Sequence, residues 1–161
     1  LGSDVPFFLS GGTALATGIG TDIRQLPSNR MDWALLVFPG EDHSTHNKTA
    51  SMYKMIDELE IGGRSTFGYR SNALVRRIIG GHKVKGYLFN SFEQVMANAF
   101  PYHREFKEKI EFLTKEEFTL TGSGPSLFMI TTEFEQADAI KGILEDNGIS
   151  TVLCQFLPKW E

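Results

Sequence analysis

Asp4 is the first residue whose type and setting could do chemistry. It stands within residues 1–8 (LGSDVPFF), where a single carboxylate precedes a proline and an apolar run, so the segment is expected to be buried. A carboxylate within hydrogen-bond reach of a hydroxyl can accept its proton and act as a general base. The structural alternative is that Ser3 or Asp4 caps a short helix with Pro6 in its first turn, and the isolated pattern favours this role.

The second candidate is the glycine segment Thr121, Gly122, Ser123 and Gly124. Taken alone it is an ordinary turn between two strands, because glycine supplies the backbone conformations that tight turns require. It does not match the dinucleotide-binding fingerprint, since Leu127 replaces the third glycine and a strand is expected to follow instead of a helix. By itself, the segment is therefore a weak signal of a phosphate site.

Together, the two segments resemble the GHMP family of small-molecule kinases. The family's G-A/S-D-V-P-F-F stretch stands at residues 2–8, and its late glycine motif stands at 121–124. Two further stretches resemble the family in order and spacing: residues 14–20, which end in G-x-G, and residues 88–93 (LFNSFE), which Phe100-Pro101 follow. The sequence contains neither the family's phosphate loop nor its lysine-bearing segment, so it resembles the C-terminal portion of such a kinase.

The resemblance implies chemical roles for the two segments. Asp4 would accept the proton of a substrate hydroxyl as that hydroxyl attacks the γ-phosphate of ATP, with Mg²⁺ as the accompanying ion. The glycine segment would shape the pocket near the reacting end of the substrate. The likeness is greatest to the family member that acts in non-mevalonate isoprenoid biosynthesis, on a small molecule with a cytidine diphosphate moiety.

A pocket for the cytosine base is also implied by the resemblance. The family member's Thr-x-x-x-Tyr/Phe stretch is matched by Thr49 and Tyr53, and the tyrosine ring would stack on the base. Ile19, between Gly18 and Gly20, stands where an apolar residue lines the same pocket. The alternative for Tyr53 is simple packing, which is the commoner role of a tyrosine on an amphipathic helix.

No metal site is predicted. His43 and His46 stand three residues apart, but zinc requires three or four ligands. Cys154 lies in an apolar run and is expected to be a small buried residue. The basic residues between positions 64 and 85 are expected to be exposed, with Arg70 or Lys83 as weaker candidates for a phosphate contact.

Composition excludes several classes of protein. The 161 residues are 41% hydrophobic, and 16 basic against 20 acidic side chains give a net charge of −4. Such a chain has no basic field to attract nucleic acid or an anionic membrane. No apolar stretch reaches membrane-spanning length. The single cysteine rules out an intrachain disulfide and fits a reducing cytoplasm.

Hydrophobic periodicity predicts the elements that position these residues. After the short N-terminal helix, we expect strands at 13–20, 22–26, 33–38, 118–121, 126–131 and 151–157, helices at 49–59, 71–79, 92–100, 106–113 and 136–147, and an irregular segment at 62–69. This order predicts an α+β fold with helices on one face of a mostly antiparallel sheet, as in the ferredoxin-like C-terminal domain of the GHMP kinases. A polar break separates residues 1–30, a remnant of the N-terminal kinase domain, from the C-terminal domain, residues 31–161.

The expected function is that of the C-terminal part of an ATP-dependent kinase. The chain alone is predicted to be inactive, because the groups that cradle the triphosphate are absent. It is also predicted to form a homodimer through the apolar surface of its first 20 residues. The alternative is a non-catalytic, ferredoxin-like binding or regulatory module.

Overall fold

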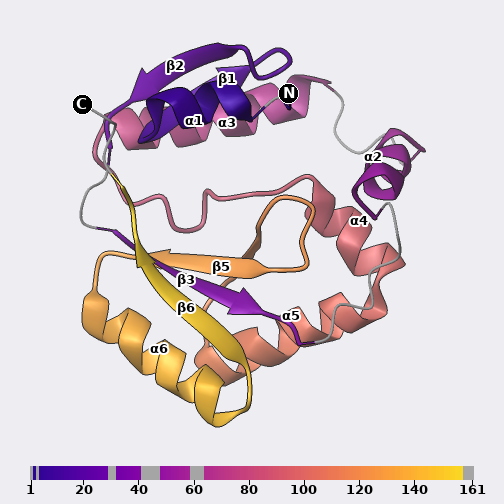
Figure 1. Ribbon diagram of the computed structural model, residues 1–161, viewed down its shortest axis with the longest axis vertical. Coiled ribbons are helices and arrows are strands. Elements are labelled where there is room, and N and C mark those ends of the chain that lie inside the picture. The colour runs from indigo at the N-terminus through magenta and orange to yellow at the C-terminus, as the bar shows by residue number, and fades with distance from the viewer. Residues whose placement is uncertain (1, 3, 29–31, 41–47, 59–63, 158–161) are drawn as a thin grey trace.

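A four-stranded antiparallel sheet organises most of the chain (Figure 1). The computed structural model describes residues 2, 4–28, 32–40, 48–58 and 64–157. Within them the sheet has the order β4-β5-β3-β6, with strands β3 Trp33–Phe38, β4 Thr119–Leu120, β5 Leu127–Thr131 and β6 Ser150–Gln155. Leu35 on β3 lies opposite Met129 on one side and Leu153 on the other.

The connections give this sheet the ferredoxin-like topology. Its strands follow one another along the chain as β3, β4, β5 and β6, with helices before β4 and before β6. This is the β-α-β-β-α-β pattern, in which the first and third strands lie side by side at the centre. The predicted α+β class is therefore confirmed.

Three helices cover one face of the sheet: α4 Phe92–Ala99, α5 Pro101–Thr114 and α6 Phe134–Asp146. The strands present alternate residues to this face, so Leu35 and Val37 are almost fully buried while Leu36 between them is less so. Pro101 separates α4 from α5, because proline is tolerated in the first turn of a helix but not in its interior. The core between sheet and helices includes Ile110 and Leu144.

A second, smaller unit lies above the sheet in Figure 1. It contains α1 Val5–Ser10 and a hairpin of β1 Thr13–Thr17 and β2 Asp22–Leu26. The helix α3, Arg64–Ile79, packs against β2. The remaining helix, α2 Lys48–Glu58, packs against α4.

Two expectations about local structure were wrong. Residues 64–69 were expected to be irregular, but α3 already begins at Arg64 and continues through Gly68, a residue that an α-helix tolerates at a cost of about 1 kcal/mol. The segment 1–8 was expected to be buried, yet α1 has no buried residue, and Phe8 and the adjoining Leu9 are 71% and 81% exposed. A six-residue helix that meets the hairpin on one side leaves its other sides to solvent.

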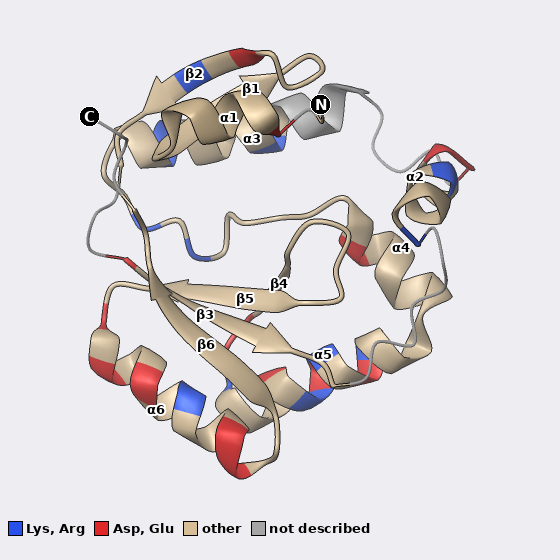
Figure 2. Cartoon of the chain, in the orientation of Figure 1, with Lys and Arg blue, Asp and Glu red and all other residues tan. Residues whose placement is uncertain are grey.

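Charged residues of both signs occur on α5, whereas α6 is mainly acidic (Figure 2). Hydrogen bonds from Lys141 and Thr151 lower the pKa of the exposed Glu145 carboxyl at the junction of α6 and β6. Among the described helices, none is long and apolar enough to cross a membrane.

Candidate functional site

The glycine segment forms the loop between β4 and β5. Gly122 and Gly124 have φ angles of +53° and +71°, a region that residues with a side chain rarely adopt. A Cβ atom on Gly124 would lie 2.7 Å from Met96 Cε and 2.8 Å from Leu120 Cδ1, whereas one on Gly122 would meet nothing within 4 Å. Gly124 is therefore required both by the backbone conformation and by the lack of space.

Backbone hydrogen bonds close this loop into a turn. The Thr121 amide donates to the Ser126 carbonyl at 3.0 Å, and the Gly124 amide donates to the Thr121 carbonyl at 2.8 Å. The peptide bond between Gly124 and Pro125 is cis. Because two of its amides are used within the turn, the loop is better suited to limiting the shape of a pocket than to cradling a phosphate.

A side-chain hydrogen bond joins the loop to α2. The Oγ1 atom of Thr49 and the Oγ atom of Ser123 lie 2.9 Å apart, and either hydroxyl can donate. The two residues are 74 positions apart in the sequence. A hydroxyl has one donor and two acceptor positions, so each keeps capacity for a further hydrogen bond to a ligand. Two predicted site segments thus lie side by side.

Tyr53 follows Thr49 by one turn on the same side of α2. Its ring meets the Phe92 ring nearly perpendicularly, at 81° and with centroids 4.9 Å apart, while 59% of the residue stays exposed. Met52, the residue before Tyr53, is fully buried and anchors the helix. The tyrosine is therefore packed against a neighbour, as the alternative role predicted, and still presents surface to a planar ligand.

Asp4 and Ile19 belong to the smaller unit. Asp4 occupies the N-cap position of α1, but its side chain makes no capping hydrogen bond, so the prediction of a side-chain cap was wrong for Asp4. The reason is its helical φ and ψ of −84° and −17°, where a capping residue normally has an extended backbone. Ile19 lies at the tip of the β1–β2 turn and is 79% exposed.

The structure brings only part of the predicted site into contact. Thr49 meets Ser123 directly, but among the described residues no hydrogen bond links Asp4 or Ile19 to either of them. Ser3 lies outside the described residues.

Sequence reasoning missed one residue that contacts the glycine loop. The Asn90 Nδ2 atom donates to the Leu120 carbonyl at 2.7 Å and to the Gly122 carbonyl at 2.8 Å. The only sequence signal was its place in the segment 88–93, to which no role had been assigned.

The remaining candidates have other surroundings. The described residues contain no group of three His, Cys, Asp or Glu side chains that could hold a metal ion, and His43 and His46 lie outside them. Cys154 is a free, half-buried thiol on β6. The Arg70 guanidinium lies 5.6 Å from the centroid of Phe89. Lys83 lines a cavity of about 420 Å³ at the end of β5 farthest from the glycine loop.

Comparison with known proteins identifies relatives of the whole chain. A protein of Dehalococcoides mccartyi (strain BAV1) is 33% identical over 157 residues, which cover 98% of this chain and 54% of the relative. A protein of Pelobacter propionicus is 33% identical over 149 residues, 92% of this chain and 49% of the relative. Both carry the name 4-diphosphocytidyl-2-C-methyl-D-erythritol kinase. No protein-family model matches the chain.

Two solved structures share the fold. A crystal structure of 4-(cytidine 5′-diphospho)-2C-methyl-D-erythritol kinase superposes with a TM-score of 0.66 and 23% identity, over 96% of this chain and 54% of that one. Homoserine kinase from Cytophaga hutchinsonii superposes with a TM-score of 0.51 and 16% identity, over 96% of this chain and 50% of that one.

The fold and the relatives together confirm that the chain resembles the GHMP family of small-molecule kinases. It is a homologue of the proteins named 4-diphosphocytidyl-2-C-methyl-D-erythritol kinase. It spans about half the length of the curated relatives that it matches.

Proposed function

We propose that the chain forms the substrate-binding part of a 4-diphosphocytidyl-2-C-methyl-D-erythritol kinase, which phosphorylates the 2-hydroxyl of that substrate in non-mevalonate isoprenoid biosynthesis. The observation that carries the proposal is the 2.9 Å hydrogen bond between Thr49 and Ser123, because it joins the predicted base-binding helix to the predicted pocket loop. Relatives named for this activity, matched over 98% of the chain, support the choice of substrate.

The proposed site binds the cytidine diphosphate end of the substrate through α2 and the glycine loop. The exposed ring of Tyr53 stacks on the cytosine, where a flat aromatic surface gains most from an aromatic neighbour. The hydroxyls of Thr49 and Ser123 offer hydrogen bonds to polar groups of the substrate. Ile19, which is exposed at its hairpin tip, supplies an apolar contact to the base.

Asp4 is the proposed proton acceptor. In the reaction, the 2-hydroxyl oxygen forms a bond to the γ-phosphorus of the second substrate, ATP, and the bond to the departing ADP breaks. The hydroxyl proton passes to the Asp4 carboxylate. The absence of a capping hydrogen bond supports this role, because the exposed carboxylate is not committed to the helix.

We propose that magnesium and the triphosphate are bound mainly by groups other than the described residues. These residues contain no metal-binding cluster of His, Cys, Asp or Glu, and two amides of the glycine loop are used within its own turn. We therefore assign the chain to substrate binding and proton acceptance, and we expect the 161-residue chain alone to transfer no phosphoryl group.

Calorimetric titration of the 161-residue chain tests this division of roles. We expect weak but saturable binding of 4-diphosphocytidyl-2-C-methyl-D-erythritol and no measurable binding of Mg-ATP. Micromolar binding of Mg-ATP would contradict the assignment of the nucleotide groups. A chain that binds neither ligand would favour the non-catalytic binding or regulatory module.

A further inference from the structure

The turn before α4 makes three hydrogen bonds through a single side chain. Besides the bonds that its Nδ2 atom donates to the Leu120 and Gly122 carbonyls, the Asn90 Oδ1 atom accepts the Phe92 amide at 2.9 Å. Both hydrogens of the Asn90 side-chain amide are therefore donated to backbone carbonyls, one in the glycine loop and one just before it, about 30 residues away along the chain. A side chain with this pattern fixes one backbone segment against another.

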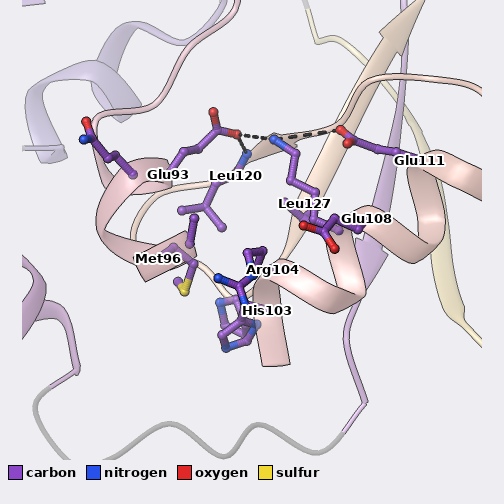
Figure 3. A pocket seen from close by; sticks show the side chains of 12 residues that line it. Glu93, Met96, His103, Arg104, Glu108, Glu111, Leu120 and Leu127 are labelled. Carbon is purple, nitrogen blue, oxygen red and sulfur yellow. Dashed lines mark hydrogen bonds and ion pairs between the residues drawn. The ribbon is translucent and has the colours of Figure 1, made fainter. Parts of the chain in front are cut away.

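Glu93 binds the same part of the loop from the next turn of the chain. Its Oε1 atom accepts the Leu120 amide at 2.9 Å and the Lys107 ammonium at 3.1 Å, and Lys107 also lies 3.8 Å from Glu111 (Figure 3). The Leu120 amide therefore donates to Glu93, and the Leu120 carbonyl accepts from Asn90. Because β4 is at the edge of the sheet, these side chains satisfy backbone groups that no further strand pairs.

Packing alone does not hold the loop on this side. A cavity of about 330 Å³ lies behind it, lined by residues that include Met96, Leu120, Pro125 and Leu127 (Figure 3). The loop is closely packed at Gly124, beside Met96 and Leu120, whereas Pro125 lines the cavity. The hydrogen bonds from Asn90 and Glu93 therefore act together with the packing at Gly124 to hold the loop in its position.

The same turn supports α2. The Phe92 amide donates to Asn90, and the Phe92 ring packs against the Tyr53 ring with centroids 4.9 Å apart. The loop and α2 are further joined by Thr49 and Ser123. The segment from Asn90 to Glu93 thus contacts both halves of the proposed cytidine site.

We propose that Asn90, assisted by Glu93, is a positioning residue that sets the glycine loop at a fixed separation from α2, so that Ser123 and Tyr53 can engage one substrate together. Asn90 does not touch the substrate in this account. The link to the substrate rests on the proposed function, whereas the positioning of the loop does not.

Amide hydrogen exchange in the full 161-residue chain tests the positioning directly. Asn90→Ala removes all three hydrogen bonds, and we expect the Thr121 and Gly124 amides to exchange about tenfold faster. The matched control is Asn147→Ala, which removes a single bond to the Ile143 carbonyl at the end of α6 and should leave the loop unchanged. Unchanged loop exchange in Asn90→Ala would overturn the proposal.

A second variant separates positioning from loss of folding. Asn90→Asp retains an acceptor for the Phe92 amide but places its second carboxylate oxygen, which replaces Nδ2, against two carbonyls, and this raises the pKa of the introduced carboxyl. Once protonated, the carboxyl can donate one hydrogen bond. Loop protection, corrected for the intrinsic exchange rate, should therefore recover as the pH falls from about 7.5 to about 5, and it should not recover in Asn90→Ala. Equal behaviour of the two variants would contradict the proposal.

Binding of cytidine 5′-diphosphate, followed by NMR, tests the consequence for the site. We expect Asn90→Ala to weaken binding about tenfold relative to both the original chain and Asn147→Ala. Faster loop exchange with unchanged binding would refute the claim that this position of the loop matters to the site. If the original chain binds no cytidine 5′-diphosphate, the proposed function fails, while the exchange and pH experiments still decide whether Asn90 positions the loop.

Discussion

Tyr53 and Asp4 are both exposed, but they differ in whether a neighbouring group fixes the side chain. Tyr53 is fixed by its perpendicular contact with Phe92, yet most of its surface remains open. Asp4 is exposed and makes no capping bond to α1. A rigid aromatic surface and an uncommitted carboxylate are what base stacking and proton acceptance require.

Replacing Tyr53 with Leu should weaken binding of cytidine 5′-diphosphate about tenfold, the equivalent of about 1.4 kcal/mol, because an aliphatic side chain cannot stack on the base. Tyr102→Leu is the matched control, since Tyr102 is a partly exposed tyrosine on α5. NMR titration measures both variants. Equal affinities would show that Tyr53 only packs against Phe92.

In an active kinase that contains this chain, Asp4→Asn should lower kcat by about 100-fold and change KM much less, because the carboxylate acts on the hydroxyl proton and not on the cytidine. The free energy of unfolding should change by less than about 0.5 kcal/mol, since no capping bond is lost. The control is Asp22→Asn, an exposed carboxylate on the neighbouring hairpin that accepts the Thr17 hydroxyl. Normal turnover in Asp4→Asn would place the proton acceptor elsewhere.

The residue types of the candidate site could be predicted, but their partners could not. Thr49, Tyr53 and Ser123 stand in recognisable segments, so the sequence indicated them as candidates. The contacts of Asn90 with carbonyls about 30 residues away depend on how α4 lies against the edge of the sheet. Backbone carbonyls occur at every residue, so no pattern of side chains marks which ones will be bound.

At the scale of elements, periodicity predicted strands and helices where one face is buried. The strand at 33–38 was predicted with its observed bounds, because an uninterrupted apolar run before Pro39-Gly40 is typical of a central strand, and β3 lies between β5 and β6. The start of α3 was missed because Gly62-Gly63 and Gly68 suggested a break. The packing of α3 against β2 depends on tertiary structure, which a local sequence pattern does not encode.

The loop between β4 and β5 offers a test of shape at this scale. Gly124→Ala should lower the free energy of unfolding by about 1–3 kcal/mol more than Gly122→Ala, because its Cβ would overlap Met96 and Leu120. Gly122→Ala has open space and should cost only the backbone strain of about 1–2 kcal/mol. Urea denaturation of both variants measures the difference. Equal losses would mean that the loop moves freely away from α4.

For the molecule as a whole, the smaller unit exposes an unusual amount of apolar surface. Phe8, Leu9 and Ile19 are each more than 70% exposed. Because exposure of apolar surface to water is energetically unfavourable, we expect the 161-residue chain to form a homodimer through α1 and the hairpin. Sedimentation should show a dimer that Phe8→Ser with Leu9→Ser converts to monomer, whereas Phe112→Ser, an exposed residue on α5, should leave it intact. A monomer at high protein concentration would contradict this prediction.

The central claim is that α2 and the glycine loop together bind the cytidine diphosphate end of the substrate. NMR chemical-shift mapping of the 161-residue chain with cytidine 5′-diphosphate tests it most directly. The account predicts that the largest shifts cluster at Thr49, Tyr53 and Ser123, and that uridine 5′-diphosphate produces smaller ones. Largest shifts around Lys83 and its cavity, or no shifts at millimolar ligand, would contradict it.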